Sequence, residues 1–418
     1  MNIWLVTVGE PLPTDSEGCE RLLRTGILAN ILVKAGHSVL WWNSTFNHTK
    51  KEHRSVKDEL INLSNSFSVQ LLRGCGYNKN VSLTRIIDHF ILARKFTKLS
   101  KQHHSPDLIL CSFPPIELAN AVTKYGKINR VPVFVDIRDL WPDLFEEVLP
   151  PVKRFLCKPL LSWMNFITIE TLKRADGILG NSDGFVGWGL KKAGRIASDL
   201  DSSFPHGYSD DEPSGQAKVR SLQFWRSHGI SKDDRIFTAC FFGAIGTNSR
   251  IELVIEAAKK LDSKYFRFII CGKGDLSNHY KTDVSVIFPG WVNASDIWTL
   301  MRMSNVGLVL YSSNVGYVSN MPNKPIEYLS AGLPLVSCLE GFLKDFIEQY
   351  KCGINFNPSG LSDTLIQLRN NPDLLSEMSN NARNVFLEKF EAKKIYSSMI
   401  DHLLKALRSS NTHLKNCG

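Results

Sequence analysis

The stretch IFTACFFGAIGTNSRIELVIEAA (236–258) joins the pattern of a buried strand to the pattern of a helix. Its first seven residues are apolar except for Thr238. Gly243 and Gly246 mark a turn, and the residues after Arg250 favour a helix. A buried strand, a glycine-containing loop and a helix are the repeating unit of a parallel sheet covered on both faces. The stretch therefore predicts a doubly wound α/β domain.

The same alternation occupies both halves of the chain, with a polar, turn-rich segment at 205–217 between them. We predict two doubly wound, Rossmann-like α/β domains with helices at the C-terminus and a cleft between the domains, because ligands of open α/β sheets bind at the carboxyl ends of the strands. The expected boundaries are 1–205 for the first domain, 206–390 for the second, and 391–418 for a C-terminal helix.

Composition restricts the class of protein. The chain has 418 residues, 43% of them hydrophobic, and no run of about 18 apolar residues, so we expect no membrane span. The first residues, MNIWLVTVGEP, indicate a core strand rather than a signal peptide. The nine cysteines follow no metal-ligand spacing and indicate reduced thiols. We expect a cytoplasmic protein that is soluble or lies on a membrane.

The net charge of +9 is concentrated in one part of the chain. Residues 50–101 carry eleven Lys and Arg against four Asp and Glu. Such an excess favours an anionic partner, such as a membrane surface, phosphates or nucleic acid, but a solvated helical face explains it equally well.

The chain lacks the sequence motifs of several common classes of enzyme. The chain has no GxGxxG after its first strand, no GxxxxGK[ST], no HExxH and no GxSxG. The sequence DLD at 199–201 matches a metal-holding DxD pattern, but it follows no apolar strand, and we predict a solvated loop there. We expect no metal cofactor.

Two glycine-containing turns are candidates for binding a diphosphate. Gly18 precedes a predicted helix, and a glycine there lets the helix N-terminus approach a phosphate closely, although an ordinary turn has the same pattern. In the second half, Gly243 precedes Arg250, which would reach the same diphosphate unless its side chain faces solvent.

A third candidate lies in MPNKPIEYLSAGLPLV (321–336). Asn323, Lys324 and Glu327 stand at the start of a helix that follows a strand and a polar loop. A carboxylate at that place accepts the hydroxyl groups of a ribose in other nucleotide-binding α/β domains. Glu327 is therefore our candidate ribose ligand.

At these residues the chain resembles a known family. The order FFGAIG, IELVIEAA, IICGKG, VIFPGWV, LVLYSS, NKPIEYLSAGLPLV and NNARNVFLEKF is similar to the second domain of glycosyltransferase family four, the retaining GT-B transferases. The N-terminal half resembles bacterial O-antigen and capsule sugar transferases, such as N-acetyl-L-fucosamine transferases, in GEPLPTD (9–15), LLRTGILANIL (22–32), GHSVLWWNSTFNH (36–48) and DIRDLWPD (136–143).

The resemblance implies a GT-B arrangement in which 1–205 binds the acceptor, 206–390 binds the nucleotide sugar, and the helix at 391–418 returns to the first domain. It also implies the residues of the donor site. Glu327 matches the second glutamate of the family's E-x7-E motif, which binds the ribose, while Ser319 stands where the first glutamate is expected. Ala244 replaces the family's arginine, and Arg250 replaces its lysine only if the loop is shifted. The candidates that supply the missing positive charge are Lys273, Asn323 and Lys324.

The resemblance also implies the reaction: a sugar leaves a nucleoside diphosphate, UDP being expected, and joins an undecaprenyl-diphosphate-linked glycan with retention. Cations and helix N-termini would stabilise the leaving diphosphate, and the departing phosphate would take the acceptor's proton. Asp139 is the expected catalytic residue, with Arg138 as its ion-pair partner; a purely structural pair is the alternative. The expected location is peripheral, on the inner face of the cytoplasmic membrane, with no nucleic-acid partner.

The helix pattern at 152–175 combines aromatic and basic residues, which suits a membrane interface, although an ordinary core helix has the same composition. Two other functions remain open: a UDP-sugar 2-epimerase of the same fold, and a non-catalytic subunit that binds a membrane partner.

Overall fold

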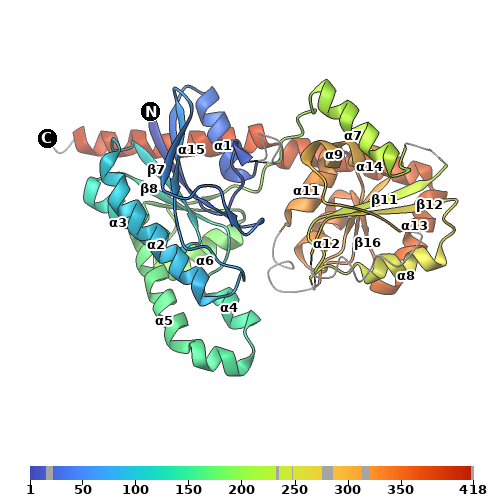
Figure 1. Cartoon of the computed structure of the whole chain (residues 1–418), viewed down its shortest axis with the longest axis horizontal. Helices are drawn as coiled ribbons and strands as arrows, with labels where there is room; N and C mark the ends of the chain where they lie inside the picture. The colour runs from blue at the N-terminus through green and yellow to red at the C-terminus, as the bar shows by residue number, and fades with distance from the viewer. Residues whose placement is uncertain (16–21, 232–234, 247, 275–285, 313–320, 416–418) are drawn as a thin grey trace. The chain divides into compact units, whose positions relative to one another are not determined.

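The computed structural model describes residues 1–15, 22–231, 235–246, 248–274, 286–312 and 321–415. The described residues form two compact units (Figure 1). Of the described residues, the first unit contains 1–15, 22–205 and 393–415, and the second contains those between 206 and 392.

The first unit is built on an eight-stranded sheet of order β10-β9-β8-β7-β1-β2-β6-β5. Its strands are β1 (Asn2–Val6), β2 (Ser38–Ser44), β5 (Glu59–Ser64), β6 (Phe67–Leu72), β7 (Leu108–Phe113), β8 (Val133–Ile137), β9 (Gly177–Gly180) and β10 (Ser202–Ser203). All neighbours pair in parallel except β5, which is antiparallel to β6. A small antiparallel pair, β3 (Phe46–Asn47) and β4 (Glu52–His53), follows β2.

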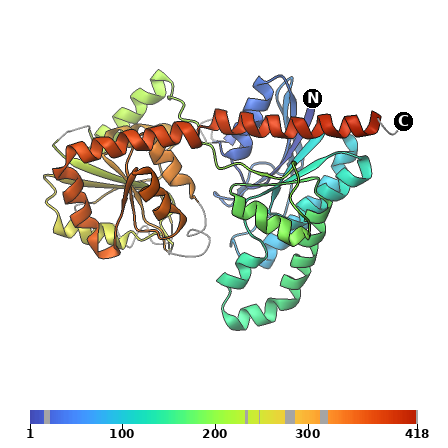
Figure 2. The ribbon, with the colours of Figure 1, turned by 180° about the vertical axis from the view of Figure 1, so that it is seen from behind.

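Helices cover both faces of this sheet. They are α1 (Arg24–Lys34), α2 (Leu83–Leu99), α3 (Ile116–Asn129), α4 (Asp143–Val148), α5 (Pro151–Arg174), α6 (Asp183–Ala193) and α15 (Ala392–Lys415), with a short turn η2 (Ser100–Gln102) after α2. Side chains of α2, α3, α5 and α6 pack with Trp4 and Trp42 in one continuous core. On the other face, His402 of α15 contacts the rings of Phe134 and Phe204, and Figure 2 shows α15 lying across this unit.

The second unit is built on a six-stranded parallel sheet of order β13-β12-β11-β14-β15-β16. Its strands are β11 (Phe237–Phe242), β12 (Phe266–Cys271), β13 (Val286–Gly290), β14 (Val306–Val309), β15 (Leu335–Ser337) and β16 (Gly353–Asn355). Its helices are α7 (Gly215–Ser227), α8 (Glu252–Lys260), α9 (Ala294–Met303), α11 (Asn323–Ser330), α12 (Phe342–Tyr350), α13 (Leu361–Asn370) and α14 (Pro372–Lys389), with η3 (Pro358–Gly360). Every residue of β11 is buried, because helices pack on both faces of this sheet.

The architecture confirms the predicted fold class of two doubly wound α/β units with helices at the C-terminus. The helix predicted after Gly18 is α1, which begins at Arg24, and α5 begins at Pro151, a residue type suited to the first helical turn. Within the described residues, none of the helices combines the length and the apolar character that crossing a membrane requires.

Candidate functional site

The carboxyl edge of the second sheet carries two closely packed glycine loops. Gly243 follows β11 with φ +141°, and Gly272 follows β12 with φ +144°. The amide of Gly243 donates to the carbonyl of Cys271 at 2.9 Å. A Cβ atom on Gly272 would lie 1.8 Å from the carbonyl oxygen of Gly243, so only glycine allows the two loops to meet in this way.

Lys324, in the first turn of α11, packs directly on this edge. A Cβ atom on Gly243 would lie 2.2 Å from Cε of Lys324, so the glycine makes room for the lysine side chain. The Lys324 ammonium donates to the hydroxyl of Tyr311 at 2.9 Å and lies 4.6 Å from the centre of that ring. Burial lowers the pKa of Lys324 to about 8, and the nearby charge of Glu327 opposes this shift.

Glu327 lies one helical turn after Lys324, so the two side chains share a face of α11. Its residue surface is 2% exposed, which is rare for a glutamate. Glu327 is therefore not the solvated acid of an ordinary amphipathic helix. A buried acid and a part-buried lysine occur together where α11 begins.

The other predicted donor residues are placed differently. The guanidinium of Arg250 forms an ion pair with Glu252 at 3.3 Å. Lys273 and Asn323 are exposed at the same edge of the sheet. Gly18 and Ser319 lie outside the described residues. Sequence reasoning missed Tyr311, although its position directly after the apolar run of β14 is a usable signal.

The carboxyl edge of the first sheet contains a buried ionic network. Asp136, at the end of β8, receives two hydrogen bonds from Arg24 of α1, at 2.8 and 3.0 Å, and one from Arg138 at 3.0 Å. Arg138 also forms an ion pair with Glu10, and its other nitrogen donates to the Thr25 hydroxyl at 2.9 Å. Glu10 and Thr25 were not singled out from the sequence, although both lie in the quoted motifs GEPLPTD and LLRTGILANIL.

The expected ion pair between Arg138 and Asp139 is not formed in the structure. Arg138 is taken up by Asp136 and Glu10, because its side chain turns back into the network at the strand ends. Asp139 instead lies at the surface, next to the network. Partial desolvation raises the pKa of Asp139, while the charges of Arg85 and Arg138 oppose the rise.

The DLD sequence at 199–201 is not simply solvated, which corrects the prediction made from its loop composition. The side chain of Asp201 is 1% exposed and forms an ion pair with Arg195 at 2.6 Å. It also accepts a hydrogen bond from the amide of Ile178 at 2.7 Å. Asp201 therefore fixes the loop against β9.

A comparison with known protein families finds a match in the second unit. Residues 224–385 match the family described as glycosyl transferases group 1. The second unit is therefore similar to this family over these residues. All three clustered residues, Gly243, Lys324 and Glu327, lie inside the matched range.

A relative named alpha-monoglucosyldiacylglycerol synthase, from Acholeplasma laidlawii, is 27% identical over 198 residues. The match covers 45% of this chain and spans about half, 48%, of the relative's length.

Solved structures show the GT-B fold over the whole chain. Sucrose-phosphate synthase from Thermosynechococcus elongatus is 16% identical with a TM-score of 0.72, and the match covers 98% of this chain and 99% of that one. HepE from Anabaena, in complex with UDP and glucose, is 15% identical with a TM-score of 0.65, covering 97% of this chain and 100% of that one. The residues that match the group 1 glycosyl transferases thus lie in the second half of a GT-B fold.

Proposed function

We propose that this protein is a retaining glycosyltransferase that moves a sugar from a nucleoside diphosphate sugar to a lipid-linked acceptor at a membrane surface. The observation that carries the proposal is the buried Glu327 and the part-buried Lys324 beside Gly243, within the residues that match the group 1 glycosyl transferases. An acid for the ribose and a cation for the diphosphate are the two charges that a nucleotide-sugar donor requires.

In this proposal Glu327 accepts the ribose hydroxyl groups, and Lys324 balances the negative charge that grows on the diphosphate as the sugar leaves. The expected nucleotide is UDP, and the transferred group an N-acetyl sugar. The complexes of the Anabaena protein HepE with UDP and with UDP-glucose support the choice of nucleotide. The exposed residues Lys273 and Asn323 are further donor candidates.

The bond between the anomeric carbon and the diphosphate oxygen breaks, and the acceptor hydroxyl forms the new bond on the same face of the sugar. The acceptor's proton passes to the departing phosphate. Asp139 is the proposed catalytic carboxylate: it accepts a hydrogen bond from the acceptor and balances positive charge on the sugar. Arg138 acts as a positioning residue, since it holds Glu10 and Asp136 at the strand ends beside Asp139. No step of this scheme requires a metal ion.

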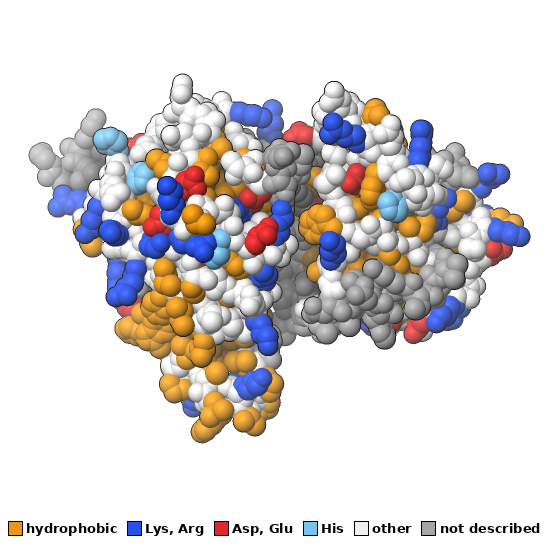
Figure 3. All heavy atoms as spheres, viewed as in Figure 1, with side chains coloured by type: hydrophobic (Ala, Val, Ile, Leu, Met, Phe, Trp, Pro, Cys, Tyr) orange, Lys and Arg blue, Asp and Glu red, His pale blue; other side chains and the backbone are white. Residues whose placement is uncertain are grey.

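The membrane part of the proposal is supported by an exposed apolar face on the first unit. Figure 3 shows hydrophobic side chains gathered where α2 and α5 lie in Figure 1. The exposed apolar residues of these two helices are Leu83, Ile87, Phe90, Val152, Phe155, Leu156 and Phe166. Phe155 is 76% exposed, so the first part of α5 is not a core-packing helix.

Basic residues accompany the apolar ones on the same two helices. Arg94 and Lys98 follow Phe90 on α2, while Lys153, Arg154 and Lys158 alternate with the exposed apolar residues of α5. A helix surface that combines apolar and basic side chains suits the boundary of an anionic bilayer. A peripheral position on the inner face of the cytoplasmic membrane agrees with this composition.

Two acceptors are compatible with a lipid surface. The motifs GEPLPTD and DIRDLWPD favour an undecaprenyl-diphosphate-linked glycan of bacterial surface polysaccharide (O-antigen or capsule) synthesis. The name of the Acholeplasma relative favours a neutral diacylglycerol acceptor as the second candidate.

The function is tested by incubating the protein with vesicles that carry one acceptor or the other and with UDP-, GDP-, dTDP- or ADP-sugars. We expect UDP-sugars to raise the melting temperature most and to support transfer to the lipid diphosphate glycan, with protein co-sedimenting with anionic vesicles. Epimer formation from UDP-N-acetyl sugar without acceptor would support the epimerase instead. Absence of nucleotide binding would overturn the proposal.

Changing Asp139 to Asn is expected to reduce the turnover of transfer about 100-fold, because the amide carries no negative charge to balance the developing positive charge. The measurement is the kcat of transfer together with the melting temperature, which should stay within a few degrees. Asp199→Asn, an exposed aspartate in a loop, serves as the control. Unchanged turnover in Asp139→Asn would remove Asp139 from the mechanism.

A further inference from the structure

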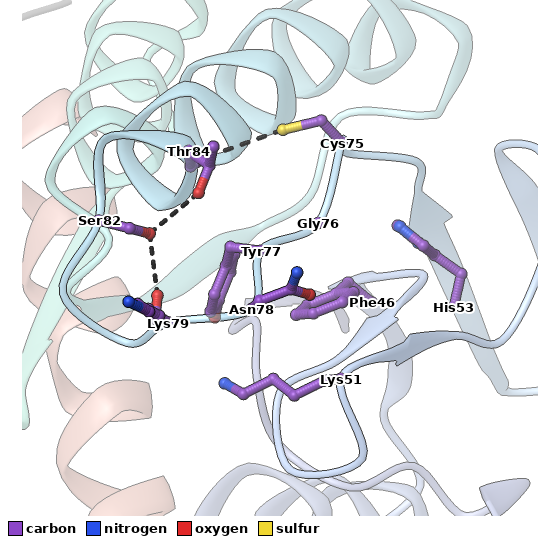
Figure 4. A pocket seen from close by; sticks show the side chains of 10 residues that line it. All are labelled: Phe46, Lys51, His53, Cys75, Gly76, Tyr77, Asn78, Lys79, Ser82 and Thr84. Atoms are coloured by element: carbon purple, nitrogen blue, oxygen red, sulfur yellow. Dashed lines mark hydrogen bonds between the residues drawn. The ribbon is translucent and has the colours of Figure 1, made fainter.

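A pocket of about 500 Å³ opens in the first unit, among the loops that follow β2 and β6 (Figure 4). Its lining consists of Phe46, Lys51, His53, Cys75, Gly76, Tyr77, Asn78, Lys79, Ser82 and Thr84. These loops leave the carboxyl ends of parallel strands, where open α/β sheets bind their ligands. The pocket lies within the basic segment 50–101, whose partner the sequence left open.

Two cations contact the tyrosine in this pocket. The ammonium of Lys51 lies 4.8 Å from the centre of the Tyr77 ring, and the guanidinium of Arg85 lies 5.4 Å from it. Both cations donate hydrogen bonds to uncharged oxygens of Asn80. Lys51 donates to the side-chain oxygen at 2.6 Å, and Arg85 donates to the backbone carbonyl oxygen of Asn80 at 2.9 Å. Among the described residues, neither cation forms an ion pair with a carboxylate.

The neighbouring titratable groups respond to this positive charge. Burial, followed by the charges of Lys51 and Arg85, lowers the pKa of His48 to about 4, and the imidazole is hydrogen-bonded to the Tyr77 hydroxyl at 2.7 Å. Asp88 is the nearby acid; it is buried and accepts a hydrogen bond from the amide of Gly76 at 2.7 Å. With Lys79 at the rim, the pocket keeps an excess of positive charge.

The pocket is also linked to the proposed catalytic carboxylate. The guanidinium of Arg85 lies 4.7 Å from the centre of the Trp141 ring, two residues after Asp139. The charge of Arg85 opposes the raised pKa of Asp139, so the two groups are within electrostatic range. Arg85 does not line the pocket itself, but it contacts the ring of Tyr77, which does, and its charge reaches Asp139.

We propose that this pocket binds a phosphate or diphosphate group of the acceptor, with Lys51 and Arg85 balancing its charge. Phe46 and Tyr77, whose ring centres are 4.8 Å apart, form an apolar wall for the group attached to the phosphate. The assignment to the acceptor rests on the proposed function. It favours a lipid diphosphate over a neutral diacylglycerol, which has no phosphate to place here.

The first test measures binding of inorganic diphosphate and of geranyl diphosphate by calorimetry at fixed ionic strength, without donor. We expect Lys51→Met and Arg85→Met each to weaken binding about tenfold to a hundredfold, because each removes a charged hydrogen-bond donor. Lys34→Met removes the same charge from the exposed end of α1 and is expected to bind like the unchanged protein. Equal affinity in all four proteins would overturn the proposal.

A second arm identifies the source of the phosphate through co-sedimentation with phosphatidylglycerol vesicles. If the two pocket variants still bind vesicles like the unchanged protein, the pocket belongs to the acceptor. If they lose both vesicle binding and diphosphate binding, the pocket binds a lipid headgroup, and the assignment to the acceptor is overturned. Failure of transfer with diphosphate binding intact would overturn the proposed function alone.

The alkylation rate of Cys75 tests the proposal without any substitution. It is an exposed free cysteine in the lining of the pocket. Saturating geranyl diphosphate is expected to slow alkylation of Cys75 at least about tenfold, as followed by peptide mass spectrometry, because the occupied pocket covers the thiol. An unchanged alkylation rate at saturation would place the diphosphate elsewhere and overturn the proposal.

Discussion

Replacing Lys324 with methionine is expected to lower kcat/KM for sugar transfer about 100- to 1,000-fold, the usual effect of removing one group that stabilises charge in a transition state. Methionine keeps most of the side-chain volume, so the packing against Gly243 and the ring of Tyr311 should persist. What is lost is the positive charge of the part-buried ammonium at the start of α11, beside Glu327.

The pH dependence distinguishes lost charge from lost packing. The ammonium of Lys324 is protonated below its pKa of about 8 and neutral above it, so in the unchanged protein kcat/KM should fall about tenfold per pH unit above pH 8. The profile of Lys324→Met should lack this fall. Lys259→Met, on the exposed side of α8, is the matched control and should behave like the unchanged protein. A full rate in Lys324→Met would exclude Lys324 from the donor site.

The proximity of Lys324 and Glu327 was predictable from the sequence, because the two residues are close together in the chain and follow a recognisable strand end. Lys324 and Glu327 are three residues apart on one helix, so their common face follows from helical geometry. The contact between Lys324 and Gly243 was not predictable, because it depends on how two loops far apart in sequence meet. The positive φ angles of Gly243 and Gly272 produce that meeting.

In the first unit, the contacts between the predicted residues could not be read from their closeness in the sequence. Arg138 and Asp139 are adjacent, and adjacency suggested an ion pair between them. The structure pairs Arg138 with Glu10, 128 residues away, because the ends of β1 and β8 lie at one edge of the sheet. The composition of the basic segment 50–101 likewise allowed two explanations, an anionic partner or a solvated helical face. The pocket around Tyr77 could not be predicted, because it depends on how β3, β4 and the loop after β6 fold together.

Replacing Arg24 with methionine is expected to lower the free energy of unfolding of the first unit by about 3–5 kcal/mol, because breaking a buried ion pair leaves an uncompensated charge. Arg24 is 3% exposed and Asp136 is fully buried. Besides Asp136, Arg24 donates to the carbonyl oxygens of Phe204 and Pro205, at 2.7 and 3.0 Å. The substitution leaves these acceptors without their donor, and Asp136 keeps only Arg138.

Hydrogen exchange measured by mass spectrometry separates this effect by unit: peptides of β8 should lose protection in Arg24→Met, while peptides of β11 should not. The two arginines hold the pKa of Asp136 below its ordinary value in spite of burial, so the pair contributes stability above about pH 4 and loses it as the pH falls. The difference between Arg24→Met and the unchanged protein should therefore shrink below pH 4. Arg24→Lys keeps the charge but loses the paired hydrogen bonds, and should lose less stability. Equal loss of protection in both units would show that Arg24 does not act through Asp136.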